Sequence, residues 1–496
     1  MKIGKSGLLA CFLAFTGAAT APLRAQSGNQ SSATNSYYGS VDAVPLTDSV
    51  MPLTLDDAIR LGLDHNLALT IARDQQKTAS GQRLNAMQGL LPTVTLEGQN
   101  GVHQYNLAAE GFRGGLLSQF PPGLVPPGTT VSLFPKVTVT QGQGNVNWTL
   151  LSLPAIEQYR AAKQGESVAF YNMQSSRGLV VLNVATAYLQ ALSANSLLDY
   201  DRELLKTDEV ALNQAVAEHD AGTTARLDEL RARVQYQTQQ QTVIAQENSF
   251  EKAKIALERE IGLSPLQKIQ LSDTSPYAEL EATGIDEAKR QAYASRQDYQ
   301  SLIHQIRQSQ LSLGAAKHER LPTLSFGGFY GVQGITGGPY VGVFNAQGEL
   351  NVPLFHEAKF RGDRQTADAN LSGLYSQMAD LKAKIDQQLR DSLLDLATQT
   401  QLVKVARSNL DLATTELDQA SQRYRAGVDD NLPLVEAQST LSNAQSQYVN
   451  TVYQYNQAKL SLARNLGILD TQYQAYLKGA PPSGTPSLPV PPQPVQ

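Results

Sequence analysis

Side chains that could do chemistry are few in this chain and lie far apart in the sequence. Histidine occurs six times in 496 residues, at His65, His103, His219, His304, His318 and His356. His356-Glu357 could begin a zinc-binding helix, but Phe360 stands where that motif requires its second histidine. A glycine-rich loop followed by a lysine, which would hold a nucleotide phosphate, is also missing from the sequence. The sequence therefore predicts no enzyme, no cofactor and no metal site.

The paired acids and the single cysteine fit other roles. Asp56 and Asp57 follow Thr54 at a predicted helix start, where a hydroxyl caps the backbone and carboxylates complement the helix dipole. Cys11 faintly resembles a lipoprotein acylation site, but the apolar run around it continues to Phe15, so lipidation is not expected. The rest of the chain has no cysteine, which excludes disulfides and thiolate metal sites.

Composition and charge narrow the class of protein further. The net charge of -5 argues against nucleic acid as a partner, because a phosphate-binding surface needs clustered lysine and arginine. Residues 1–25 have the charged start, apolar run and small final residues of a secretory signal peptide. No later run approaches the roughly 18 apolar residues of a spanning helix, so strands would have to make any membrane crossing.

The chain contains one pattern twice. A shift of about 205 residues places Ala221-Gly222 on Ala426-Gly427, and a shift of about 230 places Leu91-Pro92-Thr93 on Leu321-Pro322-Thr323. We predict a first structural repeat at residues 52–262, a linker at 263–284 and a second repeat at 285–467. Residues 26–51 are expected to form a flexible periplasmic arm without regular structure, and 468–496 a C-terminal extension with a proline-rich, disordered tail.

Helical periodicity dominates both repeats. The helices are expected at residues 53–89, 153–219 and 227–261, and again at 285–320, 356–425 and 432–466, with an interruption near residues 64–66. The two long helices would extend about 100 Å, and the shorter ones about 50 to 55 Å, so two short helices stacked end to end match one long helix. Narrow apolar stripes fit helices that touch neighbours on their flanks and water elsewhere.

A two-residue alternation of apolar and polar side chains follows each Leu-Pro-Thr segment. It predicts four strands, two after Thr93 and Thr323 and two return strands at residues 136–151 and 340–355. Such strands suit a transmembrane barrel, and on composition alone a half-buried sheet of a soluble domain is an equal alternative. Lipid does not tolerate open sheet edges and four strands enclose no useful bore, so several chains would share one barrel. About 26 extra residues near 106–135 predict a long outward-facing loop.

The order of these elements resembles the TolC-like outer membrane efflux proteins. The resemblance covers about residues 52–470 and rests on Leu53-Thr54-Leu55-Asp56-Asp57-Ala58-Ile59, the two Leu-Pro-Thr segments, Trp148, Val352 and residues 424–467. It implies an α+β membrane protein in the cell outer membrane. Four transmembrane β-strands per chain would complete a twelve-stranded trimeric β-barrel, which a long periplasmic α-helical barrel continues.

The same resemblance implies a function and partners. The chain would be a passive exit duct of a tripartite efflux or type I secretion system, carrying substrates from the periplasm to the outside. Its partners would be two further copies of itself, a periplasmic adaptor protein, an inner-membrane transporter and outer membrane lipid. The alternative is a trimeric periplasmic or surface coiled-coil structural protein without a conducting pore, and the strand hairpins favour the duct.

Two bends at the far end of the helices are the predicted docking tips. They contain Gly222-Thr223-Thr224 and Gly427-Val428-Asp429, and glycine permits the positive φ that a helix C-terminus often needs. By the resemblance, the hairpin tips of the adaptor meet such bends. The alternative interpretation is that both glycines only end helices.

A periplasmic gate is predicted next to these bends. In the family a tyrosine just before the second bend bonds to an aspartate of the first, and these positions match Tyr424 and Asp228. Of the family's acidic rings, the outer position reads Pro433 and the inner reads Glu436, and Asp429 replaces an expected basic residue. We therefore predict cation selection by a ring of Glu436, aided by Asp429 and Asp430. The alternative is that these acids are solvated residues of a helix start.

Overall fold

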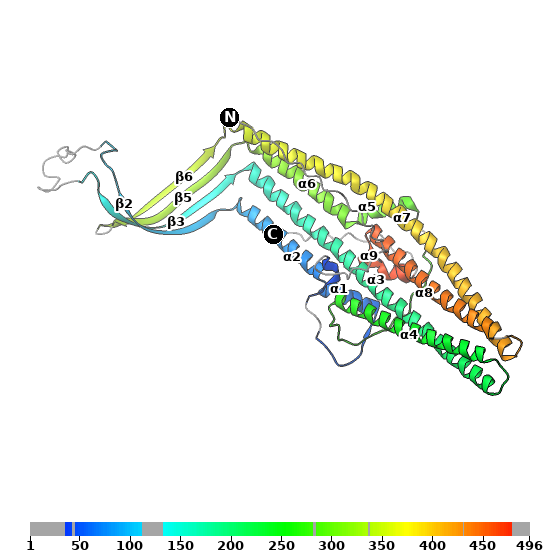
Figure 1. Cartoon of the computed structure of the whole chain (residues 1–496). Coiled ribbons are helices and arrows are strands. Elements are labelled where there is room, and N and C mark those ends of the chain that lie inside the picture. Colours follow the sequence, from blue (N-terminus) through cyan, green and yellow to red (C-terminus); the bar gives the residue numbers. More distant parts are fainter. Residues whose placement is uncertain are drawn as a thin grey trace, which may run out of the picture.

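The computed structural model describes residues 35–41, 45–111, 132–280, 284–335, 338–429 and 431–478. The predicted signal peptide, the proline-rich tail, most of the long loop and Asp430 lie outside these residues. The described part is elongated, with a curved sheet at one end and the helical bends at the opposite end (Figure 1).

Four strands form one antiparallel sheet in the order β2-β3-β5-β6. Their bounds are β2 Thr93–Gln104, β3 Lys136–Leu151, β5 Thr323–Ile335 and β6 Tyr340–Asn351. Leu96, Gly144, Tyr330 and Phe344 lie directly opposite one another across the four strands, so they share a face. The next row on the other face includes Glu97 and Gln143. The predicted alternation of an apolar and a polar face is confirmed.

The helices account for most of the length of the molecule. In the first repeat they are α1 Leu55–His65, α2 Leu67–Gln88, α3 Leu153–Asp220 and α4 Arg226–Ile261. In the second they are α5 Ile285–Ser295, α6 Gln297–His318, α7 Glu357–Arg425 and α8 Leu432–Leu466, followed by α9 Leu469–Lys478. Helix α3 packs along α2, α4 and α6, while α7 packs along α6 and α8. None of the described helices is both long enough and apolar enough to cross a membrane.

The main core lies at mid-length, where the short helices end against the long ones. Val184 of α3, Leu389 of α7 and Tyr455 of α8 are fully buried in this cluster. The ammonium of Lys459 is also buried here and donates to the carbonyls of Ala278, at 2.8 Å, and Leu477, at 3.1 Å. Burial lowers the pKa of Lys459 to about 8. These bonds hold α9 and the segment before α5 against α8.

Polar caps start the helices where the sequence indicates them. The hydroxyl of Thr54 accepts a hydrogen bond from the backbone of Asp57 at the start of α1, and Ser152 caps α3 in the same way through Ala155. The predicted interruption lies at Asn66, whose backbone is extended between α1 and α2. A second interruption, which the sequence did not indicate, separates α5 from α6 at Arg296. The predicted single helix at residues 285–320 is therefore two helices.

The expectation of an arm without regular structure at residues 26–51 is wrong at residues 36–38, whereas residues 45–50 have no helix or strand. Residues Ser36–Tyr38 form a short 3-10 helix, η1. The Gly39 carbonyl accepts from the amide of Leu67, and the amide of Val41 donates to the His65 carbonyl. Because the break at Asn66 leaves these helix-end groups without partners inside the helices, the passing chain satisfies them. Its polar sequence has no apolar period that would reveal this.

The linker expected at residues 263–284 also contains regular structure. Strand β1, Met51–Leu53, pairs in parallel with β4, Ile269–Leu271. The buried side chains of Leu53 and Ile269 place this pair on the mid-length core. The connection between the repeats is therefore fixed to the start of the first repeat.

Candidate gate and docking bends

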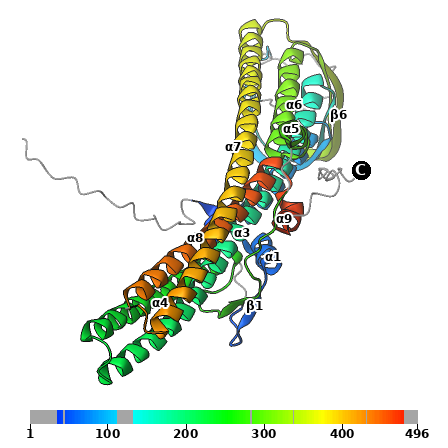
Figure 2. The same ribbon diagram turned by 90° about the vertical axis from the view of Figure 1, so that its right-hand side faces the viewer.

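The two predicted bends lie at the same end of the molecule, opposite the sheet (Figures 1 and 2). Residues 221–225 connect α3 to α4, and residues 426–431 connect α7 to α8. Gly222 has φ of 72° and Gly427 has φ of 67°, which confirms the predicted positive φ at both positions. The amide of Thr223 donates to the Glu218 carbonyl and that of Val428 to the Arg423 carbonyl, so both helices end in the same way.

Both bends are accessible from outside the chain. A Cβ atom added to Gly222 or Gly427 would meet no other atom within 4 Å. Thr223 is exposed, and Val428 keeps 66% of its surface exposed, whereas the hydroxyl of Thr224 is buried without a partner in the described chain. A partner protein could therefore reach the backbone at both glycines and the exposed apolar side chain of Val428.

The predicted bond from Tyr424 to Asp228 is not formed, and Glu218 takes its place. The Tyr424 hydroxyl donates to Oε2 of Glu218 at 3.1 Å, and the Asp228 carboxylate pairs with Arg231 of its own helix at 3.3 Å. Burial and the nearby Glu218 carboxylate raise the pKa of Tyr424 to about 12. The hydroxyl therefore keeps its proton at neutral pH and remains a donor.

Asn431 makes a second link between the bends that the sequence analysis missed. Its side chain is 1% exposed, and its amide donates to the backbone carbonyl of Asp228 at 3.3 Å. The sequence offered only an asparagine just before a helix, which normally indicates a cap. Here Asn431 forms no side-chain cap of α8 and contacts the other bend instead. Asp228 thus contributes to the contact between bends through its backbone.

The acids near the bends differ in whether a nearby arginine pairs with their carboxylates. Asp429 forms an ion pair with Arg423, whose Nη2 lies 2.9 Å from Oδ1 of the carboxylate, and this partner lowers the pKa of Asp429. Glu229, also missed, is buried and bonds to Arg233 at 2.8 Å and Arg226 at 3.1 Å. Glu436 is exposed, and its carboxylate has no hydrogen-bond partner in the described chain.

A groove beside the gate contacts reaches the Tyr424 ring. It has a volume of about 240 Å³ and lies between α3, the end of α7 and the start of α8. Val210, Gln214, Tyr424, Leu434 and Gln438 are among its lining residues. The groove separates α3 from the end of α7. The Tyr424–Glu218 hydrogen bond joins these two helices beside the groove.

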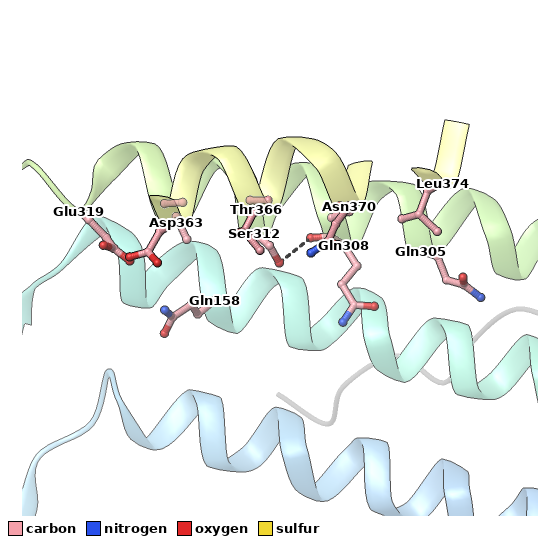
Figure 3. A pocket seen from close by; sticks show the side chains of 13 residues that line it. Gln158, Gln305, Gln308, Ser312, Glu319, Asp363, Thr366, Asn370 and Leu374 are labelled. Carbon is pink, nitrogen blue, oxygen red and sulfur yellow. Dashed lines mark hydrogen bonds between the residues drawn. The ribbon is translucent and has the colours of Figure 1, made fainter. Parts of the chain in front are cut away.

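A larger groove lies near the sheet, between α3, α6 and α7 (Figure 3). Its volume is about 530 Å³ and its lining is mostly amides and hydroxyls, including Gln158, Gln308 and Ser312. The two acids at one end, Glu319 and Asp363, both bind the ammonium of Lys359 at 2.8 Å. Among the described residues, no group of three or more potential metal-ligating side chains occurs.

The sequence places this fold in a known class of outer membrane proteins. The chain agrees with the family described as outer membrane efflux protein over residues 58–263 and 289–468, and it therefore belongs to that family. The resemblance inferred from the sequence is confirmed. The description of the family names efflux through the outer membrane, which is a transport role and not a reaction.

Two relatives show how far the sequences have diverged within the family. The chain is 25% identical over 322 residues to the toluene efflux pump outer membrane protein TtgF of Pseudomonas putida, covering 62% of this chain and 65% of that protein. It is 22% identical over 335 residues to the outer membrane protein TolC of Escherichia coli, with the same two coverages. The match thus spans 65% of the length of each of these relatives.

Solved structures show the same architecture. The Campylobacter jejuni CmeC outer membrane channel superposes with a TM-score of 0.70 and 16% identity, covering 90% of this chain and 96% of that one. At this identity the likeness demonstrates the fold alone. The predicted fold class, a TolC-like α+β protein, is confirmed.

Proposed function

We propose that this chain is the outer membrane channel of a tripartite efflux or type I secretion system. It would conduct substrates passively from the periplasm to the outside. The observation that carries the proposal is the direct continuation of a two-faced sheet into α3 and α7, which have 68 and 69 residues. Each helix extends about 100 Å, several times the thickness of a bilayer core. A sheet with an apolar outer face joined to such helices fits an outer membrane pore that continues through the periplasm.

Three copies would complete the pore. Four strands are too few to enclose a water-filled bore, and the outer edges of β2 and β6 would remain unpaired in lipid. A homotrimer supplies twelve strands and a helical barrel below them. Because TtgF is named as part of an efflux pump, we infer that a periplasmic adaptor and an inner-membrane transporter complete the system and supply the energy.

Two measurements on purified protein test this function. Native mass measurement is expected to give a trimer extracted from the outer membrane, and planar bilayers are expected to show conductance once the helical end opens. A non-conducting trimer would favour the alternative of a coiled-coil structural protein. A monomer, or a dimer with eight strands, would contradict the shared barrel.

The bends would act as both docking tips and gate. Gly222, Thr223 and Thr224 with Gly427, Val428 and Asp429 form the surface offered to the adaptor. The bonds from Tyr424 to Glu218 and from Asn431 to the Asp228 carbonyl hold the two hairpins together. Contacts of this kind can be broken by a partner that binds the separated hairpins better, so adaptor binding would open the duct.

Glu436 is expected to set the ion preference of the constriction. The exposed, unpartnered carboxylates of three copies would form a negative ring, while Asp429 contributes little because Arg423 neutralises it. Substitution Glu436→Gln should lower the cation-to-anion permeability ratio severalfold, measured as a shift of reversal potential in a salt gradient. Glu209→Gln, which removes an exposed acid from α3 away from the bends, serves as the control. An unchanged reversal potential in Glu436→Gln would eliminate the ring.

A further inference from the structure

The groove beside the gate contacts is shared by the two helical hairpins. Lys206 of α3 lines one side, and Arg425 of α7 and Gln438 of α8 line the other. The hydrogen bond from Tyr424 to Glu218 connects the same two sides next to the groove. A molecule bound in the groove would therefore contact both hairpins, as the gate bond does.

The side chain of Gln438 carries a hydrogen-bond donor that the protein leaves unused. Gln438 is 1% exposed, and its amide nitrogen is buried without a partner among the described residues. An unsatisfied buried donor is unfavourable, because it has lost its hydrogen bonds to water without a replacement. Since Gln438 lines the groove, an acceptor atom of a ligand bound there would supply the missing bond.

Two cationic side chains lie in the same lining. Arg425 is exposed and forms no ion pair with a carboxylate in the described part of the chain. Lys206 pairs with Glu203 at 2.7 Å, but these side chains are 70% and 72% exposed, so water and salt screen the pair and it is weak. The lining contains no other charged residue, which leaves positive charge in excess.

The acid of the gate bond does not cancel this charge. Glu218 is not part of the lining. One of its carboxylate oxygens accepts from the Tyr424 hydroxyl at 3.1 Å, and the other accepts from the amide of Gln214 at 2.8 Å. Glu218 is therefore held by these two neutral donors, and the guanidinium of Arg425 remains available to an anion.

The rest of the lining sets the size and shape of a ligand. Val210, Leu434 and the ring of Tyr424 supply apolar surface. The volume of about 240 Å³ is below the roughly 300–1,000 Å³ of pockets for drug-sized ligands. One turn of an α-helix, about 10 Å wide and 5.4 Å long, occupies roughly 400 Å³. The groove thus fits a small molecule with an apolar body and not a helix of a partner protein.

We propose that this groove binds a small organic carboxylate and that the bound ligand holds the gate closed. A guanidinium binds a carboxylate through two parallel hydrogen bonds, so the charged group would lie at Arg425, with Gln438 as a further donor. The ligand contacts both hairpins only while they are close together, so it binds the closed gate better and shifts the equilibrium toward it. This inference rests on the proposed function and adds a ligand that regulates its gate.

Benzoate is a suitable probe, and benzamide is the matched compound with a similar shape and no charge. Isothermal titration of the purified trimer should show that benzoate binds at least tenfold more tightly than benzamide. In single-channel recordings without adaptor, benzoate should lower the frequency of openings severalfold, whereas benzamide should leave it unchanged. Equal binding of the two compounds would overturn carboxylate recognition.

Three variants locate the binding site. Arg425→Gln and Gln438→Leu each remove one donor and should each weaken benzoate binding at least tenfold, with native mass confirming the trimer. Arg364→Gln removes an exposed arginine near the opposite end of α7 and should bind benzoate like the parent.

The possible failures can be told apart. Benzoate binding that survives both donor substitutions would overturn the site. Bound benzoate that leaves the frequency of openings unchanged would overturn its effect on the gate. A trimer that binds benzoate as expected but never conducts would contradict the proposed function and leave the binding site in place.

Discussion

Export is expected to fall to background when Gly222 and Gly427 are both replaced by valine. A residue with a Cβ atom in the left-handed region costs roughly 1–2 kcal/mol, and a β-branched residue is among the least tolerant. The strain would be repeated at two bends in each copy and would reshape the surface offered to the adaptor. An added Cβ meets no neighbour at either position, so trimer assembly should survive. Export is measured as substrate efflux from cells and assembly as native mass.

A third glycine with positive φ provides the matched control for this loss. Gly111 has φ of 92°, an added Cβ there would also meet nothing within 4 Å, and the residue lies in the first strand hairpin, away from the bends. Gly111→Val carries the same kind of backbone strain, and export should remain near the parent level. Normal export by the double valine variant, with the adaptor still bound, would show that the bends have no docking role.

Removing the bond between Tyr424 and Glu218 should convert a mostly closed channel into a mostly open one. A hydrogen bond to a charged group contributes about 1.5–3 kcal/mol, so three copies together contribute about 5–9 kcal/mol to the closed state. Moving a two-state equilibrium from 1:99 to 99:1 takes about 5.5 kcal/mol. The variant Tyr424→Phe with Glu218→Gln should therefore show a large increase in open probability in single-channel recordings without adaptor.

Two further variants show whether the partner of Tyr424 is identified correctly. Asp228→Asn leaves the Tyr424–Glu218 bond and the Asp228 backbone carbonyl in place, so its open probability should rise much less. Tyr236→Phe removes a half-buried phenol on α4 that has no hydrogen bond in the described chain, and it should behave like the parent. The lock is refuted if the double variant opens no more often than the parent. Glu218 is the wrong partner if Asp228→Asn alone reproduces the full effect.

The sequence by itself determined the repeated architecture and most element boundaries. Helix α8 occupies the residues predicted from its proline near the start and its final glycine, and α3 ends within one residue of expectation. Alternation after Thr93 and Thr323 located β2 and β5. These features are local, since a cap, a turn glycine or a periodic face depends on residues a few positions apart. The positive φ at Gly222 was predictable for the same reason.

Only the tertiary structure decided which distant groups meet. Tyr424 bonds to Glu218 rather than Asp228, although the two acids lie on either side of the same bend. This choice depends on where packing places the Tyr424 side chain relative to α3. It also depends on Arg231, which forms an ion pair with Asp228 one turn along the same helix. The packing of residues 35–41 against the break at Asn66 depends likewise on backbone groups that other helices leave unpaired. Such partners are selected by the relative positions of whole helices, which no short stretch of sequence encodes.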